Sequence, residues 1–140
     1  MFLLDTNVIS ELRKTRPHGG VLAWRNSLGP REIAIPAVVL AELQDGVEIT
    51  RRQDPIKAIE IERWIDRIMA AYAIIPIDGL VFREWAHMMA GTSDNLSIDA
   101  MIAATARIHR LVVATRDVKD FKRLGVQIVN PFTYGVEESK

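Results

Sequence analysis

Residues 2–9 read Phe2-Leu3-Leu4-Asp5-Thr6-Asn7-Val8-Ile9, in which an apolar run meets a single acid and then a helical pattern. Phe2 to Leu4 is predicted to be a short buried strand, because its three residues are apolar without alternation. The stretch from Thr6 to Lys14 is predicted to be a helix, with Thr6 or Asn7 as its N-cap. A strand that leads directly into a helix is typical of α/β proteins.

The alternation of strands and helices continues along the chain. Further short apolar strands are predicted at residues 33–35, 74–77, 111–115 and 126–129. Helices are predicted at residues 21–27, 38–49, 54–73, 80–90, 97–109 and 118–124, and a polar loop at residues 91–96. Strands that are apolar throughout belong to parallel sheets with both faces covered. The predicted fold is therefore α/β, a three-layer α/β/α sandwich with a mostly parallel central sheet.

The composition is that of an ordinary globular protein. The 140 residues are enough for one domain with a hydrophobic core, and 49% are hydrophobic and 26% charged. Basic and acidic residues number 18 each, which argues against binding nucleic acid by bulk positive charge alone. The lack of cysteine excludes disulfides, thiolate nucleophiles and cysteine-ligated zinc. Asp5 interrupts any signal-peptide pattern and no apolar run could span a membrane, so a cytoplasmic location is expected.

Four acids are expected to meet at one edge of this sheet. Asp5 directly follows the first strand, and Asp117 follows the fourth strand after one further residue. Glu42 lies on the third predicted helix, and Asp99 lies in the first turn of an Ala-rich helix whose small side chains should let it pack close to the sheet. Ligand sites in parallel sheets form at the carboxyl ends of the strands. Each acid alone fits a helix cap or a surface position, so the hypothesis depends on their joint placement.

Several carboxylates close together point to a bound cation. They repel one another, and some would take up protons unless a cation neutralised them. Mg²⁺ is a hard ion that is held by a few carboxylates and water. Such an ion lowers the pKa of bound water and stabilises charge on a phosphate. Hydrolysis of phosphodiesters is therefore the predicted class of reaction.

Four blocks of the chain resemble the motifs of PIN-domain proteins, especially the VapC-type toxins and the related FitB-like group. The blocks are Leu4-Asp5-Thr6-Asn7-Val8-Ile9-Ser10-Glu11-Leu12, Val39-Leu40-Ala41-Glu42-Leu43, Asp99-Ala100-Met101-Ile102-Ala103-Ala104-Thr105-Ala106, and Thr115-Arg116-Asp117-Val118-Lys119-Asp120-Phe121 followed by Gly125-Val126 and Asn130-Pro131-Phe132. The blocks occur in order from Met1 to about Tyr134. The resemblance implies a PIN domain at residues 1–134 and a short C-terminal tail at residues 135–140.

The resemblance also implies a function and a set of site residues. It implies a ribonuclease that depends on Mg²⁺ or Mn²⁺ and acts as the toxin of a toxin–antitoxin pair. Metal ligation would centre on Asp5 and Asp99, with Glu42 and Asp117 completing the acidic pocket. Asn7 and Thr115 would hold the ligands or a metal-bound water. Many relatives carry Asn where this chain has Asp117, so Asp120, one helical turn further on, is an alternative fourth ligand.

Partners follow from the same resemblance. The expected substrate is RNA, with transfer RNA as one candidate, and the expected inhibitor is a VapB-like antitoxin. Arg116 adjoins Asp117 in the sequence and is a candidate for contact with a substrate phosphate. The apolar helices offer more surface than one small sheet needs, which favours a homodimer and an antitoxin groove.

Other classes of protein fit the sequence less well. A haloacid-dehalogenase-like phosphatase also places an Asp after its first strand. Its motif is Asp-x-Asp, whereas this chain has Asn7 at the position of the second Asp. A phosphoacceptor receiver domain needs paired acids after the first strand, and Asp5 stands alone there. A metal-binding interaction module without catalysis remains as an alternative, although all the predicted carboxylates are present.

Overall fold

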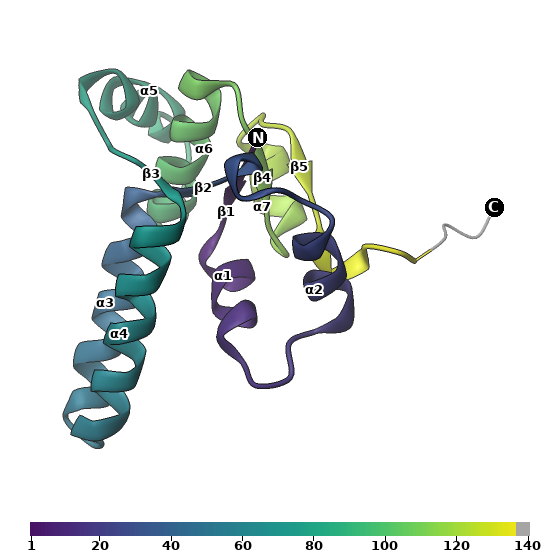
Figure 1. Cartoon of the computed structure of the whole chain (residues 1–140). Helices are drawn as coiled ribbons and strands as arrows, with labels where there is room; N and C mark the ends of the chain where they lie inside the picture. The colour runs from purple at the N-terminus through teal and green to yellow at the C-terminus, as the bar shows by residue number, and fades with distance from the viewer. Residues whose placement is uncertain (137–140) are drawn as a thin grey trace.

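A five-stranded parallel sheet forms the centre of residues 1–136, the part of the chain that the computed structural model describes (Figure 1). The strands are β1 (Phe2–Leu4), β2 (Ile33–Pro36), β3 (Ala73–Ile75), β4 (Val112–Ala114) and β5 (Ile128–Val129). Their order is β3-β2-β1-β4-β5, and each neighbouring pair is parallel. All the strands therefore end at the same edge, which is called the carboxyl edge below.

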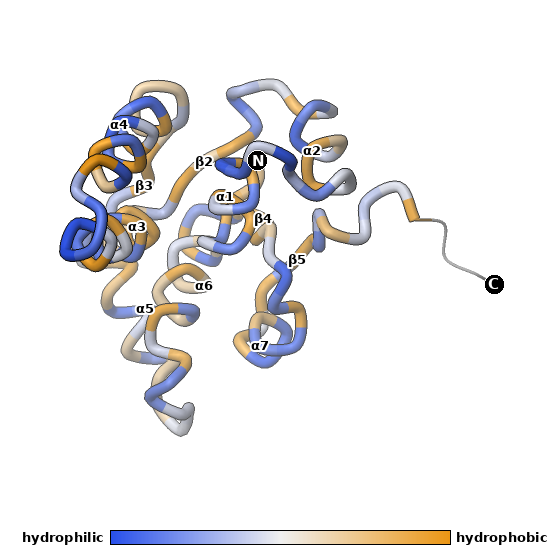
Figure 2. Tube along the Cα trace, turned by 90° about the horizontal axis from the view of Figure 1, so that it is seen from below, coloured by the Kyte–Doolittle hydropathy of each residue, from blue (hydrophilic) through white to orange (hydrophobic). Residues whose placement is uncertain are grey.

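Helices cover both faces of the sheet. They are α1 (Thr6–Arg13), α2 (Gly19–Asn26), α3 (Ala37–Arg51), α4 (Pro55–Ala71), α5 (Gly79–Met89), α6 (Ser97–His109) and α7 (Val118–Arg123), with short 3-10 helices at Pro30–Glu32, Asp94–Leu96 and Pro131–Thr133. Figure 2 shows α2 on one side of the sheet, and α5, α6 and α7 on the other. The predicted three-layer α/β/α sandwich is confirmed. No helix within residues 1–136 is long and apolar enough to cross a membrane.

The core lies between the sheet and the helices. Leu3, Leu4, Ile33 and Ile35 on the central strands are fully buried. Six residues of α6 are buried, and four of them are alanines, at positions 100, 103, 104 and 106. Small side chains let a helix backbone approach a sheet closely, as was expected for this helix. The close approach brings Asp99, in the first turn of α6, near the carboxyl edge.

Several boundaries differ from the sequence-based expectation. The third strand is Ala73–Ile75, two residues shorter at its end than expected, because Pro76 has no N–H to offer to the ladder. Helix α2 begins at Gly19 rather than at residue 21, since the His18 side chain accepts a hydrogen bond from the Gly20 N–H and caps it. The predicted loop at residues 91–96 contains the 3-10 turn Asp94–Leu96.

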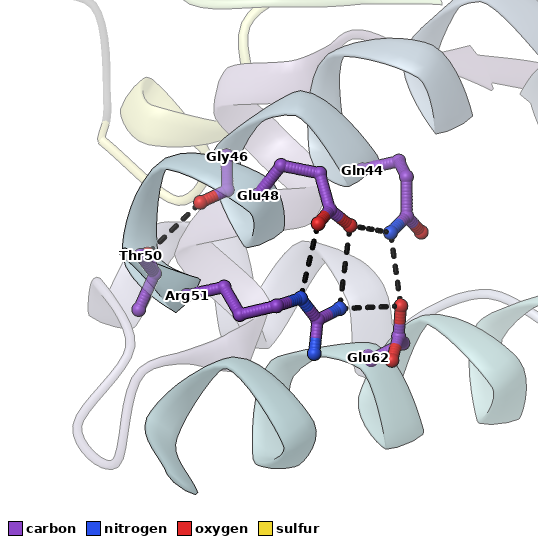
Figure 3. A network of polar contacts seen from close by, with 6 residues as sticks. All are labelled: Gln44, Gly46, Glu48, Thr50, Arg51 and Glu62. Carbon is purple, nitrogen blue, oxygen red and sulfur yellow. Dashed lines mark hydrogen bonds and ion pairs between the residues drawn. The ribbon is translucent and has the colours of Figure 1, made fainter. Parts of the chain in front are cut away.

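Helices α3 and α4 form a long antiparallel hairpin that extends beyond the body of the molecule (Figure 1). A polar network on its surface joins the two helices (Figure 3). Gln44 Nε2 donates to Glu48 and to Glu62, at 2.7 and 2.9 Å. Arg51 also donates to both carboxylates, at 3.0 Å each for its nearest contacts. The network orients α3 against α4, and α3 carries Glu42.

We expect Gly125→Ala to lower the free energy of unfolding by about 1–2 kcal/mol. Gly125 has φ +74°, and a Cβ there would lie 2.8 Å from Arg107 Nη2. That atom donates to the carbonyls of Leu124 and Gly125 and fixes the end of α7. Gly46→Ala is the matched control, because Gly46 lies within α3 with open space around its Cβ position and should gain up to about 1 kcal/mol. Urea unfolding measures both; equal effects would contradict the argument.

Candidate active site at the carboxyl edge of the sheet

Asp5 is the most enclosed acid of the carboxyl edge. It follows β1, and its backbone N–H donates to the Ala114 carbonyl of β4. Its carboxylate accepts hydrogen bonds from the Thr6 N–H at 2.7 Å, the Thr115 hydroxyl at 2.7 Å and the Asn7 amide at 3.2 Å. The expectation of Thr6 or Asn7 as the N-cap of α1 is wrong: Asp5 is the cap, and this leaves both neighbouring side chains free to reach across the edge.

Asn7 and Thr115 tie Asp5 to Asp117. The Asn7 amide donates to Asp117 Oδ2 at 3.3 Å as well as to Asp5. Its carbonyl oxygen accepts the Arg116 N–H at 3.2 Å. Thr115 donates to Asp5 and accepts the Asp117 N–H at 2.9 Å. The structure therefore brings these segments together, although Asn7 and Asp117 are 110 residues apart in the sequence.

Glu42 reaches the same edge through Thr6. It lies on α3, and its Oε1 accepts a hydrogen bond of 2.5 Å from the Thr6 hydroxyl. The sequence predicted Thr6 only as a possible helix cap, and its hydrogen bond to Glu42 was not predicted. Its position directly after Asp5 was the available signal, because a residue that follows an edge acid is itself at the edge. The contact places a second acid beside the first turn of α1.

Asp99 and Asp120 complete the acidic group. Burial, together with the nearby charges of Asp5, Asp117, Asp120 and Glu42, raises the pKa of Asp99 to about 7, and burial is the largest cause. Burial also raises the pKa of Asp5, while the hydrogen bonds from Thr115 and Thr6 oppose the rise. Asp99 is therefore within the electrostatic reach of every other predicted acid. Asp120 lies in the first turn of α7 and is half-buried.

In the absence of divalent cations, we expect the protein to lose stability as the pH rises from about 4 to about 7. The folded protein keeps the proton on Asp99 up to about pH 7, whereas the unfolded chain releases it near 3.8. The unfolded state therefore binds fewer protons in this interval, and the free energy of unfolding falls. Thermal unfolding across this range measures the effect. Asp99→Asn should flatten the dependence, and an unchanged slope in that variant would contradict the assignment.

The donor set fits a hard divalent cation by its chemistry. Carboxylate oxygens are the ligands that Mg²⁺ and Mn²⁺ prefer, and a cation would relieve the repulsion that raises the pKa of Asp99. The side chains do not stand in a finished ligand arrangement: within residues 1–136, no three His, Asp or Glu side chains are placed to hold one ion together. The ligand roles of Asp5, Asp99, Glu42 and Asp117 or Asp120 therefore stay predictions.

Comparison with known proteins assigns the chain to a family. Residues 2–127 match the family model described as PIN domain, and the chain belongs to that family. It is 36% identical to the toxin FitB of Neisseria gonorrhoeae, covering 94% of this chain and 99% of the relative. It is 35% identical to the VapC ribonuclease Y4jK of Sinorhizobium fredii, covering 94% and 98%. Because the chain belongs to the PIN family, the phosphatase and the receiver domain are excluded as alternatives.

Solved structures agree with this assignment. The crystal structure of FitAcB from Neisseria gonorrhoeae contains a chain that is 35% identical, with a TM-score of 0.83 over 94% of this chain and 99% of that chain. The VapBC2 complex of Rickettsia felis bound to promoter DNA contains a chain with a TM-score of 0.74 at 22% identity, covering 92% and 97%, and shows the same fold.

Proposed function

We propose that this chain is an endoribonuclease that depends on Mg²⁺ or Mn²⁺ and acts as the toxin of a toxin–antitoxin pair. The observation that supports this most is the linkage of Asp5 to Asp117 through Asn7 and Thr115, at an edge that also carries Glu42. Such a set of acids suits cation-assisted chemistry on phosphate. The names of the relatives, a VapC ribonuclease and the toxin FitB, support the same activity.

Each side chain has a distinct proposed role. Asp5 and Asp99 hold the cation, and Glu42 and Asp117 complete the pocket, with Asp120 as the alternative to Asp117. When bound, the cation supplies an activated water and stabilises the charge that develops on the phosphate. Thr115 and Asn7 keep the Asp5 carboxylate oriented by donating to it, at 2.7 and 3.2 Å. Oriented carboxylates bind a metal more tightly because less freedom is lost on binding.

A groove beside Glu42 supports the proposal that an antitoxin binds this chain. It has a volume of about 220 Å³ and runs between α1 and the α3–α4 hairpin. Its lining residues are Thr6, Ser10, Arg13, Glu42, Leu43, Gly46, Thr50, Ile61 and Trp64. An antitoxin segment in this groove that carries an arginine would place its charge among the acids of the carboxyl edge. The FitAcB and VapBC structures, whose chains share this fold, are the basis for proposing a VapB-like antitoxin.

The proposed assembly is a homodimer in the cytoplasm. Large apolar side chains are exposed on the outer helices: Ile56 is 74% exposed, Leu80 61% and Phe82 46%. Exposed apolar groups of this size favour burial against a second protein surface. The oligomeric state and the location stay predictions.

The test of the proposed function is cleavage of purified RNA. We expect the protein to cut one or more members of a panel of transfer and ribosomal RNAs with Mg²⁺ or Mn²⁺, and to stop when EDTA removes the metal. Co-purification with the product of the adjacent reading frame tests the antitoxin. An intact panel under all metal conditions would contradict the nuclease, and cleavage that persists in EDTA would contradict the metal dependence.

A further inference from the structure

An arginine and an aromatic ring are stacked beside the carboxyl edge. Phe132 follows β5 in the turn Pro131–Thr133, where its N–H donates to the Asn130 side chain at 3.0 Å. The Arg116 guanidinium carbon lies 3.9 Å from the centre of the Phe132 ring. The ring is 9% exposed and also packs against His18, with 5.2 Å between the ring centres. A well-packed ring thus supports an exposed cation.

The position of Arg116 is fixed at both ends. Its N–H donates to Asn7, the residue that bridges Asp5 and Asp117. The ring of Phe132 holds its guanidinium at the other end. The backbone of Arg116 therefore lies at the acidic edge, and its guanidinium is held on the Phe132 ring one side-chain length away. A guanidinium that stacks on a ring through its face keeps its N–H groups, which point outward in its plane, available for other acceptors.

Arg116 forms no ion pair with a carboxylate of residues 1–136. Arg51 and Arg107 each contact a carboxylate within 3.0 Å, whereas Arg116 takes part in none of these pairs. Glu11, the acid of α1 whose pKa is lowered in part by the charge of Arg116, already accepts hydrogen bonds from Lys14 and from the His18 N–H. Internal charge neutralisation therefore does not account for the placement of Arg116.

We propose that Phe132 is a positioning residue that holds Arg116 ready to bind a backbone phosphate of the RNA next to the acidic edge. This inference rests on the proposed function. An edge of carboxylates repels a polyanion, so a substrate needs a fixed cation beside it to approach. A planar guanidinium that is already held in place binds phosphate through two N–H groups with little further loss of freedom.

The test measures RNA binding and cleavage separately. Binding of a short fluorescein-labelled single-stranded RNA is followed by fluorescence anisotropy in EDTA, and KM and kcat are measured with Mn²⁺. We expect Arg116→Ala to weaken binding about tenfold and to reduce the slope of log affinity against log salt by about 0.7. Phe132→Leu should weaken binding about threefold, and Phe132→Tyr should restore it. The losses should appear in KM more than in kcat.

A double variant separates positioning from a structural role. If Phe132 acts through Arg116, Phe132→Leu should have no further effect on binding in the Arg116→Ala background. The matched control is Tyr72→Leu, which removes another stacked pair, with Arg25 5.4 Å from the ring centre, at the opposite end of β3 from the carboxyl edge. Thermal unfolding reports any loss of fold, and Arg116→Lys, which keeps the charge without the stack, should recover only part of the affinity.

Other outcomes overturn the inference. Unchanged binding in Arg116→Ala, or equal losses in Phe132→Leu with and without Arg116, would contradict it. Unchanged binding accompanied by lowered stability would assign Arg116 to a structural role with Glu11. Failure of the proposed function is distinguishable: a protein that cuts no RNA, yet binds it through Arg116 in EDTA, would refute the nuclease and retain the phosphate contact.

Discussion

Asp99→Asn should reduce the rate of RNA cleavage by about a thousandfold while leaving the fold intact. Asp99 is the acid whose pKa is raised most clearly towards neutrality, through burial and the charges of four neighbouring acids. A carboxyl group placed so unfavourably in the free protein gains most when a cation binds. Asparagine has nearly the same shape but carries no charge, so the variant removes the attraction for the cation and relieves the repulsion among the remaining acids.

The measurement is single-turnover cleavage with saturating Mn²⁺, together with thermal unfolding. Thermal stability at pH 8 without metal should rise in Asp99→Asn, because the unfavourable charge is gone. Asp94→Asn is the matched control, since Asp94 is an exposed acid in the turn directly before α6 and should cleave RNA as the wild type does. Activity within a few fold of wild type in Asp99→Asn would remove Asp99 from the catalytic set.

Thr115→Val should lower activity by about 10- to 100-fold and the free energy of unfolding by about 1–3 kcal/mol. The Thr115 hydroxyl is fully buried, donates to Asp5 at 2.7 Å and accepts the Asp117 N–H at 2.9 Å. Valine fills the same space but leaves both partners without that bond. Loss of the donor also raises the pKa of Asp5 further, so the pH at which cleavage reaches half its maximum should move upward.

Two control variants show whether an activity loss in Thr115→Val comes from the missing hydrogen bond to Asp5. Thr115→Ser keeps the hydroxyl and should retain most of the activity. Thr105→Val removes another fully buried hydroxyl, which bonds only to the Met101 carbonyl of its own helix, and should leave cleavage unchanged. If Thr105→Val and Thr115→Val lowered activity equally, the loss would reflect buried hydroxyls in general and not the orientation of Asp5.

The fold class and the approximate positions of the strands and helices along the chain could be predicted from the sequence, because these signals are local. One apolar run ends directly before Asp5 and another ends shortly before Asp117, which places both acids at strand ends, and parallel strands bring those ends to one edge. The Ala-rich pattern of α6 similarly predicted a helix that lies close to the sheet. These features depend on neighbouring residues alone, so no knowledge of the three-dimensional structure was needed to find them.

The contacts within the site could not be predicted in the same way. The reach of Thr6 to Glu42 depends on where α3 crosses α1, and the stack of Arg116 on Phe132 depends on the path of the chain after β5. Nothing local in the sequence encodes either crossing. The N-cap of α1 was predicted wrongly for a related reason. Asp5 accepts hydrogen bonds from the first N–H of the helix and from two side chains. Tertiary contacts therefore decide which of the consecutive residues Asp5, Thr6 and Asn7 is the cap.

The central position of β1 determines when the acidic edge can fold during synthesis of the chain. β1 is the first strand to be made, yet it pairs with β4, and Asp5 receives its hydrogen bond from Thr115 across 110 residues. The acidic edge therefore cannot assemble until the ribosome has passed residue 117. At roughly 5–20 residues per second this takes about 6 to 23 seconds. Asp5, the first of the acids proposed to be catalytic, is therefore made long before the Thr115 hydroxyl that orients its carboxylate.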